Sequence, residues 1–136
     1  MRYVVWLLSA LLFIPYVQAN AVSEEKPIQH LNVPDITSLE EAKKLFVEKT
    51  LEMKSKQVLD VEALQQIHLI TYSLEKSVAY FSKTLSGNER LLINDIAQIV
   101  EAIHLHSEHN RPVETENQLT HYFNLASRFI YEHWTL

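Results

Sequence analysis

The chain has 136 residues, with one glycine, four prolines, no cysteine and a formal net charge of −5. So few turn-forming residues exclude phosphate-binding glycine loops and argue against an all-β protein of this length. The missing cysteine excludes disulfides, thiol nucleophiles, cysteine zinc sites and covalently attached c-type haem, so any chemistry must come from histidine, carboxylates, hydroxyls or methionine.

The N-terminal segment has the pattern of a secretory signal. Arg2 precedes an uncharged apolar run over residues 4–14, and small residues at Ala19 and Ala21 offer cleavage sites. The run is about half the ~20 apolar residues that span a bilayer, which favours a cleaved signal over a membrane anchor. We expect residues 1–19 to be a signal peptide and the protein to be periplasmic, with no stable membrane insertion after cleavage.

The remaining chain is expected to form one domain preceded by an arm. Removal of the signal leaves 117 of the 136 residues and a net charge of −6, because Arg2 is the one charge removed. Pro27 and Pro34 interrupt any helix in residues 20–37, which we interpret as a flexible arm. A mildly acidic exported chain is also a poor candidate for nucleic-acid binding, which requires clustered Lys and Arg.

Two amphipathic helices are predicted after the arm. The first extends from residue 38 to about residue 55 and begins with a capping box formed by Ser38 and Glu41. Its apolar face consists of Leu39, Ala42, Leu45, Phe46 and Met53. The second begins after a cap at Asp60, and its apolar positions alternate steps of three and four. They are Leu64, Ile67, Thr71, Leu74, Val78, Phe81 and Leu85.

Two further helices follow a predicted tight turn. Gly87 is expected to end the second helix in a left-handed conformation, and Asn88 to cap the third. The third carries Leu92, Ile93, Ile96, Ile99, Val100 and Ile103 and ends before Pro112. The fourth starts either at Pro112 or at a capping box beginning at Thr115. Its core face is Leu119, Tyr122, Phe123, Ala126, Phe129, Ile130 and Trp134. Short loops between four such helices predict an all-α, antiparallel up-down-up-down four-helix bundle over residues 38–136.

Polar residues accompany the apolar stripes of the second and third helices. Their spacing places each set along one side of its helix. If the two helices pair antiparallel across Gly87, His68 lies near His106 and Glu75 lies near Glu101. The sets are His68, Tyr72 and Glu75 on the second helix, and Glu101, His104 and Glu108 on the third.

This pattern resembles a family of small exported bacterial helical proteins that is catalogued only as a domain of unknown function. The likeness covers about residues 38–132 and rests mainly on two phrases, residues 67–75 and residues 100–108. The resemblance implies a shared role for the two polar sets but no particular reaction. The overall plan is also similar to the soluble periplasmic four-helix cytochromes, although the Cys-x-x-Cys-His attachment motif of their c-type members is absent.

The polar sets suggest a metal site. Imidazole and carboxylate bind borderline divalent metals, and bundle sites use Glu and Glu-x-x-His motifs on facing helices. Glu101 and His104 supply one such motif, whereas no carboxylate stands three residues before His68, so a full di-iron site is not expected. The pattern is compatible with a mononuclear or surface site for Cu, Zn or Ni, to which His106 and His109 can add. Its ligands would be His68, Glu75, Glu101 and His104.

The same residues are open to a second interpretation. A network of hydrogen bonds between His and Glu, with the Tyr72 hydroxyl as a further partner, would fix the register of the two helices. The protein would then be a structural or interaction module of the cell envelope, with another envelope protein as its partner. A more remote alternative is a b-type haem held by Met53 and His133.

Enzyme catalysis has little support in the sequence. No Ser-His-Asp order stands out, and tightly packed bundles of this size rarely offer the cleft that acid and base carboxylates require. We therefore expect a non-enzymatic periplasmic protein with a binding or accessory role.

Overall fold

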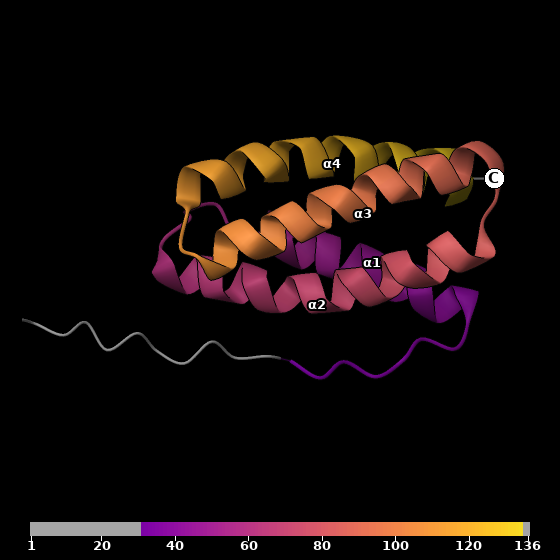
Figure 1. The fold of residues 1–136 in the computed structure, drawn as a ribbon, viewed down its shortest axis with the longest axis horizontal. Coiled ribbons are helices and arrows are strands. Elements are labelled where there is room, and N and C mark those ends of the chain that lie inside the picture. Colours follow the sequence, from indigo (N-terminus) through magenta and orange to yellow (C-terminus); the bar gives the residue numbers. More distant parts are fainter. Residues whose placement is uncertain (1–30, 135–136) are drawn as a thin grey trace, which may run out of the picture.

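The computed structural model describes residues 31–134, and this part of the chain is all-α (Figure 1). Its helices are α1 (Leu39–Lys54), α2 (Val61–Thr84), α3 (Gly87–Glu108) and α4 (Pro112–Trp134). The predicted all-α four-helix fold is confirmed. The predicted signal peptide and the first part of the predicted arm, up to residue 30, lie outside the described residues.

Consecutive helices pack side by side and run in opposite directions. α2 packs against both α1 and α3, and α4 packs against α3 (Figure 1). Thr71 on α2 contacts His104, whereas Ser82, further along α2, contacts Asn94, so residue numbers fall along α3 as they rise along α2. The α1 and α4 helices are also antiparallel. Phe46 packs against Trp134, whereas residue 50, further along α1, contacts residue 122, which comes earlier in α4.

The predicted start signals of α1 and α2 are present, with one local difference. The side chain of Ser38 accepts a hydrogen bond from the Glu41 amide at 3.2 Å, and that of Asp60 accepts one from Ala63 at 2.8 Å. In a capping box the Glu41 carboxylate would accept from the Ser38 amide. It accepts instead from the amide of Thr37 at 3.0 Å, so the helix entry is stabilised one residue earlier.

The α2–α3 turn differs from its predicted form. Gly87 has a positive φ of 58°, as expected for this turn. However, α2 ends at an extended Leu85, Ser86 is the N-cap of α3, and Gly87 is already its first residue. The prediction that Asn88 caps α3 is therefore wrong. The half-buried Leu85 side chain packs on the core, so the chain turns before the glycine instead of at it.

Aromatic rings fill the end of the core where α4 terminates. Phe46 lies 5.8 Å, between ring centroids, from each of Phe81, Phe129 and Trp134. The predicted core faces are largely buried, but Leu39, in the first turn of α1, retains 39% of its exposure. α4 begins at Pro112, the earlier of its two predicted starts.

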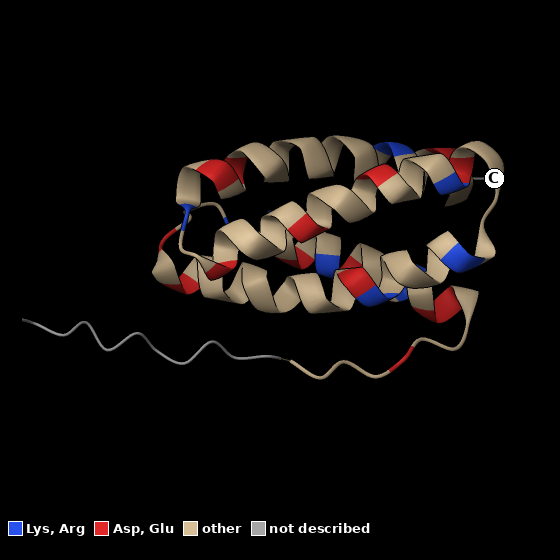
Figure 2. Cartoon of the chain, in the orientation of Figure 1, with Lys and Arg blue, Asp and Glu red and all other residues tan. Residues whose placement is uncertain are grey.

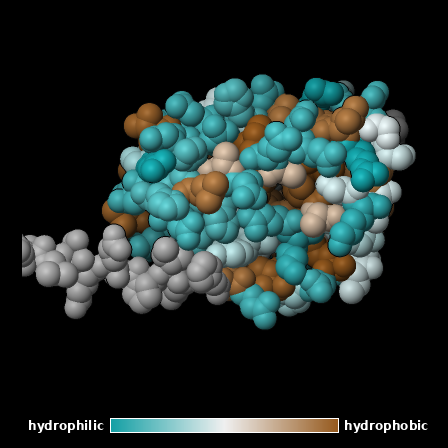
Figure 3. All heavy atoms as spheres, viewed as in Figure 1, coloured by the Kyte–Doolittle hydropathy of each residue, from teal (hydrophilic) through white to brown (hydrophobic). Residues whose placement is uncertain are grey.

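The surface is mixed in charge and polarity. Acidic and basic residues are interspersed along the helices, as the colours of Figure 2 show. Hydrophilic residues predominate on the face seen in Figure 3, with hydrophobic ones scattered among them. Among residues 31–134, no helix combines the length and apolarity that crossing a membrane requires.

Candidate metal site between α2 and α3

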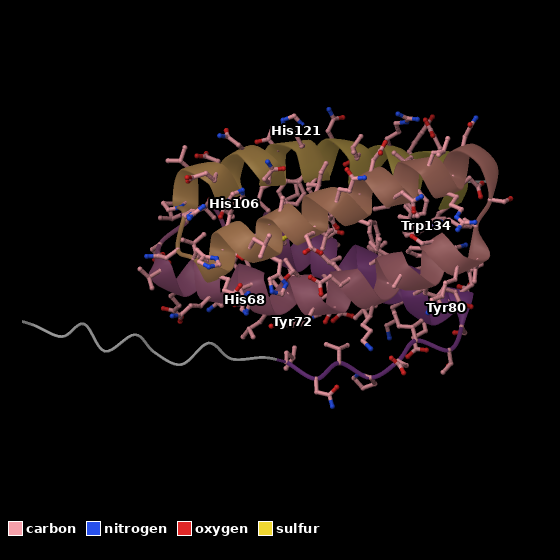
Figure 4. All side chains as sticks on the ribbon, in the orientation of Figure 1. His68, Tyr72, Tyr80, His106, His121 and Trp134 are labelled. Carbon is pink, nitrogen blue, oxygen red and sulfur yellow. The ribbon has the colours of Figure 1, made fainter. Side chains whose placement is uncertain are left out.

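Two histidines from neighbouring helices meet at the α2–α3 contact. His68 follows the buried Ile67 on α2 and is itself buried, and its ring centroid lies 4.6 Å from that of the half-buried His104. The predicted neighbour of His68 was His106. Two residues along a helix rotate a side chain by about 200°, so His106 points away from His104, and in Figure 4 it lies on the α4 side of α3.

Hydrogen bonds orient the ring of His104. Its Nδ1 lies 2.8 Å from Oε1 of Glu75 and 3.1 Å from Oγ1 of Thr71. The Thr71 hydroxyl donates its one hydrogen to the main-chain oxygen of His68 at 2.6 Å. An ionised Glu75 can only accept hydrogen bonds, and the hydroxyl hydrogen of Thr71 is already used. The hydrogen that Nδ1 of His104 shares with these two groups must therefore be on Nδ1 itself. In the neutral form of the ring, this arrangement leaves the lone pair on Nε2, the atom that can bind a metal.

Burial and neighbouring charges shift the acidity of the carboxyl and phenol groups here. Burial is the main cause that raises the pKa of Glu75, and the Glu101 charge raises it further, whereas the His104 contact lowers it. The pKa of Tyr72 is also raised, first by burial and then by the charges of Glu108 and Glu75. The ring of Tyr72 packs edge-on against both imidazoles, at 5.2 Å from His68 and 4.9 Å from His104. The site is thus partly shielded from solvent and has acidic surroundings.

A third potential ligand comes from the next turn of α3. Glu108 lies four residues after His104, on the same side of the helix. One potential ligand atom from each of His68, His104 and Glu108 lies within 4.8 Å of the other two. A tetrahedral metal with bonds of about 2.0–2.1 Å holds its ligand atoms about 3.3 Å apart. Small side-chain rotations would therefore close this group around an ion.

The structure groups the predicted ligands differently from the sequence pattern. His68 and His104 are in the group, Glu75 contacts His104 from outside it, and Glu101 is exposed and outside it. The carboxylate of the group is that of Glu108. The spacing of four between His104 and Glu108 was the signal for this pair, but the Glu-x-x-His motif of Glu101 and His104 led to the choice of Glu101 instead.

The residues of the haem alternative lie apart. His133, near the end of α4, is 2.9 Å from the Glu89 carboxylate at the start of α3. Met53 is buried in the last turn of α1, beyond Thr50, which hydrogen-bonds Tyr122 at 2.6 Å. Tyr122 and His133 are eleven residues apart on one helix, or about 16 Å at 1.5 Å per residue. Met53 and His133 therefore do not face a common haem position.

Comparison with protein families supports the resemblance inferred from the two phrases. The model of a family of unknown function, DUF6746, matches residues 1–131. The expected likeness to an uncharacterised family is confirmed. Comparisons with curated proteins and with solved structures give no significant match. The likeness to four-helix cytochromes and the bacterial origin remain predictions.

Proposed function

The chain belongs to this family of unknown function, and we propose that it is a non-enzymatic protein that binds one divalent transition-metal ion between α2 and α3. The proposed ligands are His68, His104 and Glu108. The observation that carries the proposal is the gathering of two imidazoles and a carboxylate, from two helices, within 4.8 Å.

The environment of His104 supports a ligand role. Metal-bound histidines usually donate their second ring N–H to a carboxylate or carbonyl, which fixes the tautomer and makes the ligand nitrogen more basic. The Nδ1 of His104 has this partner in Glu75 at 2.8 Å, which leaves Nε2 for the ion. Glu75 therefore acts on the metal through His104, as a positioning residue.

The donor atoms define the class of metal. Two nitrogens and one carboxylate oxygen, without a thiolate, suit Zn(II), Ni(II) and Cu(II), and Cu(II) is favoured by the general order of affinities. Supply in the cell decides between them as much as affinity does. We propose that binding takes place in the periplasm after removal of residues 1–19, in line with the signal pattern of the N-terminal segment.

The test is a metal titration of the exported, processed protein purified without a histidine tag. Cu(II), Zn(II) and Ni(II) are titrated into the wild type and into a His68→Ala/His104→Ala variant. The matched control is His106→Ala/His109→Ala, which removes the same number of imidazoles at the end of α3. We expect stoichiometric binding that only the first variant loses. Equal, weak binding in all three proteins would refute the proposal.

A second candidate function rests on the hydrogen bonds themselves. Thr71 and Glu75 on α2 both contact Nδ1 of His104 on α3, so the three side chains tie the two helices in one register. Under this alternative the cluster serves a structural or interaction module. His104→Ala would then lower the melting temperature by the same amount with and without metal. A bound ion stabilises the folded state by about 2.7 kcal/mol at one hundred times its Kd. If His104 is a ligand, the loss of melting temperature caused by His104→Ala is therefore larger with metal than without it.

A further inference from the structure

A small cavity lies at the end of the bundle away from the candidate metal site, where α1 and α3 begin and α2 and α4 end. Figure 4 shows Trp134, which lines it, at this end of the bundle and His68 toward the other. Its volume is about 120 Å³, and it is open to solvent on one side. An apolar cavity of about 150 Å³ in another protein holds one benzene molecule. The cavity therefore has the size of a molecule with a single ring.

The walls of this cavity are apolar and largely aromatic. Phe81 and Phe129 are fully buried and line its inner part, whereas Trp134 is half-buried and lines it nearer the surface. Leu39 and Leu85 border it as well, and neither of them is fully buried. Apolar surface that still faces water is a source of binding energy, because covering it with a ligand is favourable.

The charged groups at the rim of the cavity balance each other. Lys43 of α1 contributes one positive charge, and its Nζ lies 5.8 Å from the centroid of the Trp134 ring. Glu89 of α3 contributes one negative charge, and its Oε1 lies 2.9 Å from Nδ1 of His133. When the His133 ring is neutral, the rim has no net charge to compensate a charged ligand. Since an uncompensated charge loses its hydration at a high cost in an apolar cavity, a neutral ligand is favoured.

A hydroxyl group on the ligand would find an acceptor at this rim. A carboxylate accepts several hydrogen bonds, so Glu89 can accept one from a ligand and keep its contact with His133. An aromatic ring suits the walls, because rings pack edge to face, as Phe129 already does with Phe81 and with Trp134.

We propose that this cavity is a second binding site, which takes a small neutral molecule with one aromatic ring and one hydroxyl group. The ring packs against Phe81, Phe129 and Trp134, and the hydroxyl donates a hydrogen bond to Glu89. The site does not depend on the proposed metal site. Phe81 and His68 are thirteen residues apart on α2, or about 20 Å at 1.5 Å per residue.

The test uses the fluorescence of Trp134 in the exported, processed protein. Removal of residues 1–19 removes Trp6, so Trp134 is then the only tryptophan and reports on the cavity. Benzyl alcohol is titrated into the wild type, into Leu39→Phe, which fills the cavity, and into the matched control Leu91→Phe, which changes an exposed leucine outside it. We expect a saturable change in the wild type and the control, and its loss in Leu39→Phe.

Charged ligands and a second pair of variants test the rim. Benzoate and benzylamine have nearly the shape of benzyl alcohol, and at mildly alkaline pH, where imidazole is ordinarily neutral, we expect both to bind more weakly by about tenfold or more. Glu89→Ala should weaken the binding of benzyl alcohol by about fivefold, the effect of one hydrogen bond. The matched control is Glu114→Ala, because Glu114 is also in the first turn of its helix but at the other end of the bundle.

Each part of the inference has an outcome that would overturn it. An equal fluorescence change in Leu39→Phe and the wild type would overturn binding in the cavity. Tighter binding of benzoate or benzylamine would overturn the preference for a neutral ligand, and equal affinities in Glu89→Ala and its control would overturn the hydrogen bond to Glu89. Absence of a saturable change in the wild type would overturn the second site as a whole, including the case in which residues 135–136 occupy the cavity.

Discussion

Replacing Glu75 by glutamine separates a metal site from a structural network. The change removes the charge of the carboxylate that lies 2.8 Å from Nδ1 of His104 but keeps an oxygen that can accept the same hydrogen bond. Loss of such an outer partner lowers metal affinity by about 10–100-fold, and the retained acceptor places Glu75→Gln at the lower end. We expect affinity to fall by about tenfold, or about 1.4 kcal/mol.

The same variant is expected to keep or gain stability without metal. Burial raises the pKa of Glu75 above its ordinary value of 4.5, so the folded state binds this proton more tightly than the unfolded state does. The free energy of unfolding of the wild type therefore falls as pH rises from 4.5 through the folded-state pKa. Glutamine does not titrate, so the free energy of unfolding of Glu75→Gln should not show this decrease with rising pH.

The assay is a chelator competition for Zn(II) together with urea unfolding of the metal-free protein at several pH values. Glu101→Gln is the matched control, because it removes a nearby charge from an exposed position outside the proposed ligand group. Its effect on affinity should stay below about threefold, since exposed charges are screened. Unchanged zinc affinity in Glu75→Gln, or an equal loss in both variants, would refute the argument that Glu75 acts through His104.

Three further predictions concern the fold. Phe46→Ala should lower the free energy of unfolding by about 3–5 kcal/mol, because a fully buried ring is lost from the aromatic cluster. A loss below about 1 kcal/mol, measured by urea unfolding, would contradict the burial of this ring in the core. Tyr122→Phe should cost about 1 kcal/mol at neutral pH, through loss of the 2.6 Å bond to Thr50. Because burial raises the pKa of Tyr122 above its ordinary value of 10.0, wild-type stability should fall above pH 10.0, and a fall of equal size in the variant would argue against this cause. Gly87→Ala should lower the free energy of unfolding by about 1–2 kcal/mol from the positive φ alone, since no atom lies within 4 Å of the added Cβ. Gly87→Asn should lower it less. Equal thermal stability of Gly87→Ala and the wild type would exclude a left-handed conformation at this turn.

Apolar periodicity and capping residues were sufficient to predict the four helices, because burial of one face and the Ser38 and Asp60 caps are local in sequence. The exact turn around Gly87 was not predictable, because the packing of Leu85 on the core decides where the chain leaves α2. The arrangement of the candidate metal site was likewise only partly predictable. Helical spacing placed the polar residues on shared faces, but it could not give the rotation of α2 against α3.

The level along α3, and not the side of the helix, determines which carboxylate joins the histidines. Glu101 and Glu108 are seven residues apart, so they lie on the same side of α3 but about 10 Å apart along its axis. Glu108 lies in the group with His68 and His104, whereas Glu101 is exposed and outside it. The prediction took Glu101 from its Glu-x-x-His spacing with His104, and it therefore contained the two histidines of the group but chose Glu75 and Glu101 over Glu108.

The central claim is that one ion binds between α2 and α3, and anomalous X-ray diffraction from crystals grown with Zn(II) tests it most directly. We expect one strong anomalous peak at about 2.0–2.2 Å from an imidazole nitrogen of His68, Nε2 of His104 and a carboxylate oxygen of Glu108. A zinc peak only at other carboxylate–histidine pairs, such as Glu89 and His133, or no peak between α2 and α3, would contradict the account.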